Sequence, residues 1–127
     1  MGRWQGRSKR LATGARVRFC RKKRLYEMGR PPAETVLGPR KIKIERIYGG
    51  KRKLKAYIAD MVNVSVQSTG KTQKVPIKEV LSNPASVEYT RRKIITKGAI
   101  LSTELGKVRV TSRPGQDGII NGILIRE

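Results

Sequence analysis

The chain has 127 residues, of which 30 are Lys or Arg and 9 are Asp or Glu, so its formal charge is +21. A compact chain with this excess needs a negative partner, most often nucleic acid and less often an anionic membrane surface. It has no His and a single Cys, which excludes a His–Cys zinc site, an internal disulfide and histidine acid–base catalysis. We therefore expect no metal, no cofactor and no enzymatic activity.

The sequence also argues against export and membrane insertion. The first ten residues, MGRWQGRSKR, contain no apolar region of the kind that a secretory signal peptide needs. The longest nearly apolar run, IINGILI at 119–125, is far shorter than the ~20 residues that span a bilayer. We expect a cytoplasmic protein without a membrane partner.

Charge is distributed unevenly along the chain. Residues 1–55 hold nineteen basic and three acidic side chains, whereas residues 56–127 hold eleven basic and six acidic ones. This asymmetry is typical of a basic arm joined to a more ordinary globular body. We predict a basic N-terminal extension over residues 1–40 and a β-barrel domain over residues 41–127.

The N-terminal extension shows no sustained periodicity, because Gly and Pro recur throughout it. Its best helix candidate is about 15–28, where Phe19, Lys22, Lys23 and Tyr26 fall on one face. That face is not an apolar stripe, so such a helix has no core to pack against. The extension is expected to be disordered alone and to become ordered on its partner.

Arginine dominates the extension, and its planar guanidinium binds phosphate through two hydrogen bonds and stacks on bases. Trp4, Phe19 and Tyr26 are available to stack on unpaired bases. Motifs that read duplex DNA are absent from the sequence, so structured RNA fits better. The predicted RNA contacts in the extension are Arg3, Trp4, Arg7, Lys9, Arg10, Arg16, Arg18, Arg21, Lys22, Lys23, Arg24, Arg30 and Arg40.

From residue 41 the sequence reads as short strands. KIKIERIY alternates and then shifts phase at Ile47, which indicates a bulge, and Gly49-Gly50 forms a hairpin turn. Next come LKAYIA (54–59) and MVNVSVQ (61–67), with Val62, Val64 and Val66 alternating with polar residues. Thr69-Gly70 turns the chain, and QKVPI is a strand whose Pro76 favours an edge or a bulge.

The second half of this body continues in the same way. KEVLSNPAS (78–86) is compatible with one short helical turn, followed by VEYT, RRK and the strand-like IITKGAILST. KVRVTS alternates again, RPGQDG is a strong turn, and IINGILI supplies the closing strand. The fold class is therefore mostly β, a small barrel of about six to eight short strands with a long basic N-terminal extension.

Other motifs offer little chemistry. Cys20 has cationic neighbours, but without a base it is best interpreted as an incidental side chain. SVQSTGKT (65–72) lacks the first glycine of a phosphate-binding loop and lies between strands, so Gly70-Lys71 is interpreted as a turn. A second basic cluster beside a predicted strand is either a solvated edge or a further RNA contact. The predicted RNA contacts outside the extension are Arg91, Arg92, Lys93 and Arg113.

WQGRSKR, TGARVR, RKKRLYEMGRPPAETVLG, IITKGAIL and VRVTSRPGQDGIINGIL together resemble the S-eight-e family of archaeal and eukaryotic small-subunit ribosomal proteins, in its compact archaeal form. The resemblance is collinear from Trp4 to Ile125, and MGRPPAET with RPGQDG is its most specific part. Two departures are Ala15, where the family usually has Gly, and Leu11, where it usually has a basic residue.

The resemblance implies a structural constituent of the small ribosomal subunit, with a β-barrel body and an N-terminal extension threaded along ribosomal RNA. It implies ribosomal RNA and neighbouring ribosomal proteins as partners and no enzymatic activity; we expect no homo-oligomer. Two alternatives stay open from the residues themselves. One is a free RNA chaperone or translation-associated factor, and the other is a cationic protein that binds anionic membranes, for which the extension lacks an apolar helix face.

Overall fold

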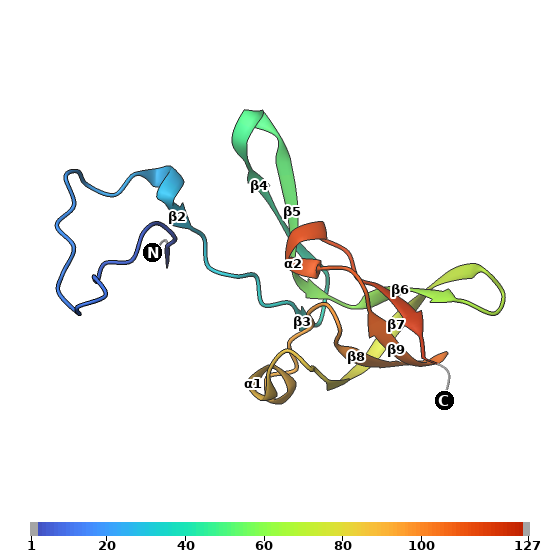
Figure 1. The fold of residues 1–127 in the computed structure, drawn as a ribbon. Helices are drawn as coiled ribbons and strands as arrows, with labels where there is room; N and C mark the ends of the chain where they lie inside the picture. The colour runs from blue at the N-terminus through green and yellow to red at the C-terminus, as the bar shows by residue number, and fades with distance from the viewer. Residues whose placement is uncertain (1–2, 126–127) are drawn as a thin grey trace. The chain divides into compact units, whose positions relative to one another are not determined.

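The computed structural model describes residues 3–125 (Figure 1). Contacts between Cα atoms divide the chain into two compact units, one up to Pro32 and one from Ala33 onward. Most of the regular structure is β, as the sequence predicts. Residues 33–40, which the sequence places in the basic extension, make their contacts with the second unit, where Thr35 is buried.

The first unit has little regular structure. Strand β1 (Arg3–Trp4) pairs antiparallel with β2 (Met28–Gly29), and a 3-10 helix, η1, spans Leu25–Glu27. The helix considered for residues 15–28 is therefore wrong except for this last turn. An apolar stripe is what would have given a longer helix a surface to bury, and this segment has none.

The core of the second unit is a closed barrel of five strands, in the order β10-β6-β7-β8-β9. Their bounds are β6 Met61–Val66, β7 Lys71–Ser82, β8 Ile100–Thr103, β9 Gly106–Val110 and β10 Asn121–Leu124. The sequence predicts six to eight strands in the barrel, and this number is too high. Parallel pairing of β10 with β6 closes the barrel, while all its other pairs are antiparallel.

Inward-facing residues of the five strands fill the barrel with small and β-branched side chains. Val62 and Val64 are almost completely buried and Val66 is half-buried, which confirms the alternation seen in the sequence. Burial of such side chains stabilises the barrel by about 25 cal/mol per Å² of apolar area. The rest of the buried cluster is Ala59, Val75, Ile77, Val80, Ile95, Ala99, Leu101, Val108, Val110 and Ile120.

Pro76 lies where β7 changes partners. Residues 71–76 of this strand pair with β6, and residues 77–82 pair with β8, with a register shift between Ile77 and Glu79. Because proline cannot donate to a ladder, the strand accommodates it where one pairing ends and the next begins. Pro76 pairs with Met61 of β6 and has no partner in β8, which fits the edge interpretation, and the register shift beside it fits the bulge.

A second sheet, in the order β3-β5-β4, precedes the barrel in sequence. It contains β3 (Val36–Leu37), β4 (Lys41–Arg46) and β5 (Arg52–Ala59). The hairpin of β4 and β5 turns at the 3-10 helix η2 (Tyr48–Gly50), which confirms the turn predicted at Gly49-Gly50. The register shift falls between Lys41 and Ile42 rather than at Ile47, so the predicted place of the bulge is wrong.

Two short helices complete the second unit. The helical turn predicted for residues 78–86 is wrong, since β7 continues to Ser82 and helix α1 spans Val87–Arg91, after Pro84. The buried Asn83 side chain organises this corner: its Nδ2 donates to the Ile94 carbonyl (2.8 Å) and the Thr96 hydroxyl (2.9 Å).

RPGQDG, predicted as a turn, forms helix α2 (Pro114–Asp117). Pro114 opens this helix, where its missing N–H is not needed. Gly118 ends it with a φ of 76°, in the left-handed region, and its N–H donates to the Pro114 carbonyl.

Candidate nucleic-acid interface

The predicted RNA contacts lie on the surface of the protein. Every Lys and Arg among them is exposed, and Trp4 is half-buried. Within residues 3–32 there are eleven such cations and one carboxylate, that of Glu27. The described part of the first unit therefore presents positive charge with almost no internal compensation, which is the arrangement expected of a surface that binds a polyanion.

Trp4 organises an aromatic and cationic centre in the first unit. Its ring meets Phe19 edge to face, with 5.9 Å between the ring centroids, and its indole N–H donates to the Arg7 carbonyl (2.6 Å). The Lys23 ammonium lies 5.6 Å from the centre of the Trp4 ring. Trp4 and Phe19 thus pack on each other, which keeps this loop folded around the tryptophan.

Lys9 lies close to Lys23 in the same centre. The positive charge of Lys9 lowers the pKa of the Lys23 ammonium below its ordinary value. Two neighbouring ammonium groups repel each other unless an anion lies between them. A phosphate placed here would relieve this repulsion, so the centre has the electrostatics of a phosphate site.

Arg21 and Glu27 form a salt bridge within the first unit. Two guanidinium nitrogens of Arg21 donate to the two carboxylate oxygens of Glu27, at 3.1 and 2.6 Å, and the Arg24 amide donates to the same carboxylate. Arg21 also lies 5.9 Å from the Tyr26 ring centre. The hydrogen bond from Arg21 lowers the pKa of Glu27, and the same bond raises the pKa of Arg21. Arg21 is thus tied to the protein itself.

A tight turn between Arg10 and Arg16 presents the next group of cations. These two residues form an isolated antiparallel bridge, and the guanidinium of Arg10 donates to the Gly14 carbonyl (2.9 Å). Gly14 has a φ of 84° with open space where a Cβ would be, so this turn suits glycine. Ala15, the departure from the family pattern, is exposed in the same turn.

Several arginines of the first unit are available to a partner. Within the described residues, the side chains of this group form no ion pair with a carboxylate, unlike that of Arg21. Cys20 is exposed and has a free thiol. The available arginines are Arg3, Arg7, Arg16 and Arg18.

The second basic cluster lies at the end of α1, where Lys93 contacts Glu79 of β7. Each of its three cations has a carboxylate partner: Arg91 pairs with Glu88, Arg92 with Glu34, and Lys93 with Glu79. The hydrogen bond from Lys93 lowers the pKa of Glu79. These side chains would have to give up or share their ion pairs to contact RNA, so they are weaker candidates than the arginines of the first unit.

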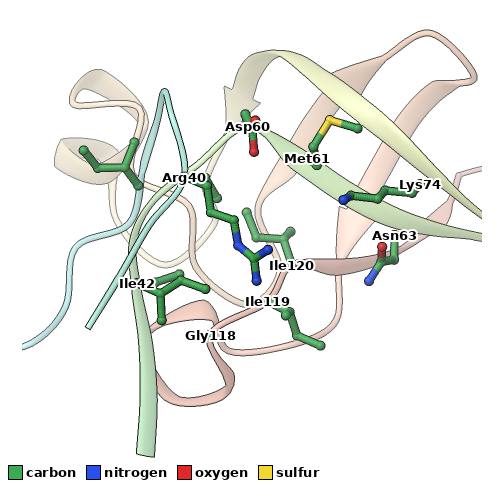
Figure 2. A pocket seen from close by; sticks show the side chains of 12 residues that line it. Arg40, Ile42, Asp60, Met61, Asn63, Lys74, Gly118, Ile119 and Ile120 are labelled. Atoms are coloured by element: carbon green, nitrogen blue, oxygen red, sulfur yellow. The ribbon is translucent and has the colours of Figure 1, made fainter. Parts of the chain in front are cut away.

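Arg40 belongs to a pocket of about 170 Å³ between the β4–β5 hairpin, β6 and the segment after α2. Figure 2 shows its side chain extending toward Ile119 and Ile120, with Lys74 on the far side. The lining combines apolar side chains with the polar ones of Arg40, Asp60, Asn63 and Lys74. Arg113 lies apart from this lining, at the start of α2, where its backbone N–H donates to the Asp117 carboxylate.

Sequence reasoning missed the cations of the β4–β5 hairpin. Seven Lys and Arg residues lie between positions 41 and 55 with one acidic residue, Glu45. The signal was present as a run of positive charge, but the segment was assigned to the barrel.

Among the described residues, no group of three or more His, Cys, Asp or Glu side chains is placed to hold a metal ion. No helix within residues 3–125 is long and apolar enough to cross a membrane.

A five-stranded barrel, together with exposed arginines that form no ion pair among the described residues (Arg3, Arg7, Arg16 and Arg18), defines a cationic β-barrel protein suited to bind a polyanion. The family model described as ribosomal protein S8e matches residues 4–125, and the chain belongs to this family. The chain is 52% identical over 128 residues to small ribosomal subunit protein eS8 of Methanococcus aeolicus, with all of both chains covered. It is 50% identical over 122 residues to the protein of that name from Methanocorpusculum labreanum, which covers 96% of this chain and 98% of the relative.

Proposed function

We propose that this chain is a structural constituent of the small ribosomal subunit and binds ribosomal RNA chiefly through residues 3–32. The observation that carries the proposal is the excess of exposed cations in this unit over its one carboxylate, in a chain of the ribosomal protein S8e family. Its partners are the small-subunit ribosomal RNA and neighbouring ribosomal proteins, and its place is the cytoplasmic ribosome. The chain carries out no chemistry: it neutralises phosphates so that RNA helices pack closely.

Different residues of the first unit have different roles in this proposal. Arg3, Arg7, Arg16 and Arg18 contact phosphates, because they form no ion pairs with carboxylates in the described chain. The Arg21–Glu27 pair holds the loop in shape, as does the contact of Trp4 with Phe19. A loop that is already folded loses less conformational entropy when it binds, which strengthens the complex.

Sedimentation tests the assignment to the ribosome. The full chain, tagged and produced in an archaeal cell, is expected to sediment with small subunits and to stay with them through a high-salt wash. Recovery as free protein would favour a separate RNA chaperone, and recovery with lipid vesicles would favour membrane binding. Either result would contradict the proposal.

Salt dependence tests the role of the first unit. Each lost phosphate contact reduces the slope of log K against log salt concentration by about 0.9 on duplex RNA regions, so four substitutions reduce it by up to about 3.6. A control removes four exposed lysines of the second unit and is expected to reduce the slope less. An equal reduction in both variants would contradict the special role of the first unit. The test variant changes Arg3, Arg7, Arg16 and Arg18 to Gln, and the control changes Lys71, Lys74, Lys78 and Lys97 to Gln.

A further inference from the structure

The β4–β5 hairpin is the part of the second unit that extends away from the barrel strands (Figure 1). Its two strands pair in continuous register from Ile42 opposite Ala56 to Arg46 opposite Arg52. The Ile47 amide donates to the Lys51 carbonyl (2.8 Å), which closes the tip. The tip is therefore a defined structure at the end of a two-stranded ribbon.

The acidic charge of the hairpin lies opposite Lys53, near the tip end of the two-stranded ladder. Glu45 is its one carboxylate, and it is buried against Lys55, with 2.8 Å between the carboxylate and the ammonium. Lys43 approaches the same carboxylate at 3.8 Å. The tip thus carries Lys51 and Arg52 without an acidic residue among its neighbours along the chain.

Like charges also lie opposite one another near the tip. Arg46 and Arg52 are cross-strand partners, so both guanidinium groups leave the ribbon on the same face. Directly opposed like charges destabilise a strand pair, and an anion bound between them turns this repulsion into attraction. Arg52 thus lies beside a second arginine on this face of the hairpin.

An aromatic ring stands at the end of this basic ribbon. Tyr48 is 81% exposed, and the two glycines that follow it have φ values of 71° and 72°. No atom lies within 4 Å of the position where a Cβ would stand on Gly49 or Gly50. A partner can thus approach the backbone beside an exposed ring, which is the geometry of a stacking platform for an unpaired base.

We propose that the tip of the β4–β5 hairpin is a second RNA-binding element, in which Tyr48 stacks on an unpaired base while Lys51 and Arg52 bind the adjacent phosphates. The inference rests on the proposed RNA-binding function and adds a site to it. Charge decides in favour of RNA over a protein groove: burying the tip cations against a protein would demand a matching set of carboxylates, whereas RNA supplies an anion at every nucleotide.

Three substitutions of one residue test the stacking. The probe is the small-subunit ribosomal RNA of Methanococcus aeolicus, transcribed in vitro and bound to the full chain. Tyr48→Ala is expected to weaken binding by about 5- to 150-fold, the range found when a stacking aromatic is removed. Tyr48→Phe keeps the ring and should bind like the original chain, whereas Tyr48→Leu keeps apolar area without a stacking face and should bind like the Ala variant.

A charge variant provides an independent measurement. Lys51→Gln with Arg52→Gln is expected to lower the salt slope by about 1.4 to 1.8, from about 0.7 per contact on single strands and 0.9 on duplex. Tyr48→Ala should leave the slope unchanged, because a stacked ring releases no counterions.

The outcomes separate this inference from the proposed function. Unchanged binding of Tyr48→Ala, in a chain that still loses affinity when the first-unit arginines are replaced, overturns the hairpin site alone. So does full binding by Tyr48→Leu, which would indicate an apolar contact such as a protein groove. Failure of the unaltered chain to bind the RNA overturns both proposals.

Discussion

Gly118 ends α2 and packs against β5 of the β4–β5 hairpin, so it should not tolerate a side chain. The Cβ of an alanine here would lie 2.7 Å from the Cβ of Leu54 in β5, and both are atoms that cannot rotate away. Its φ of 76° adds a second cost, because this left-handed conformation disfavours every residue with a Cβ.

The magnitude follows from these two costs. The left-handed backbone costs alanine about 1–2 kcal/mol. Overlap with Leu54 requires α2 and β5 to move apart, and overpacking of this kind costs about 1–3 kcal/mol. We expect Gly118→Ala to lower the free energy of unfolding by about 2–5 kcal/mol, a large share of the 5–15 kcal/mol typical of a domain.

Gly49→Ala is the matched control. Gly49 has nearly the same φ, 71°, but open space where its Cβ would stand, so it should lose only the backbone cost of about 1–2 kcal/mol. Urea unfolding followed by far-ultraviolet circular dichroism measures both variants, whereas tryptophan fluorescence would report on the first unit, where Trp4 lies. Equal losses in the two variants would refute the argument that Leu54 excludes a side chain at Gly118.

Three further outcomes follow from contacts within each unit. Asn83→Ala should lower the free energy of unfolding by about 1–3 kcal/mol in the same assay, because buried partners lose their hydrogen bonds; a loss within error would contradict this role. The pKa of Glu27 is lowered in the folded chain, so its ionised form stabilises the first unit at pH values above the ordinary glutamate pKa. This stabilisation is lost as the pH falls through the lowered pKa. NMR titration should show the pKa of Glu27 returning toward its ordinary value in Arg21→Gln. Gly6→Ala should displace the Trp4 ring, which lies 2.6 Å from the added Cβ, and should shift the tryptophan emission spectrum; an unchanged spectrum would show that the ring does not pack there.

The mostly-β class and the strands of the barrel could be predicted because their signals are local. Alternation at Val62, Val64 and Val66 reports one buried face whatever the strand order is. The glycine pair at 49–50 marks a turn by its own backbone preference. The number of barrel strands could not be read in this way, since β4 and β5 alternate like barrel strands but pair in a separate sheet.

The predicted RNA contacts also depend partly on local features and partly on long-range contacts. Composition indicated a polyanion as the partner, and the order of the residues placed most of the excess positive charge before residue 56, because charge is a property of residues and not of their contacts. Which cations remain available depends on ion pairs formed by folding. Arg92 is joined to Glu34 and Lys93 to Glu79, residues far apart in the sequence.

The sequence was therefore sufficient for the family, the class of partner and the basic N-terminal region. Tertiary structure was needed to show that β7 changes partners at Pro76, that Gly118 lies against Leu54, and that the hairpin presents Tyr48 beside its cations. The physical reason is the range of each interaction. Charge, periodicity and backbone preference are encoded over a few residues, whereas register, ion pairing and exposure arise only when distant segments of the chain meet.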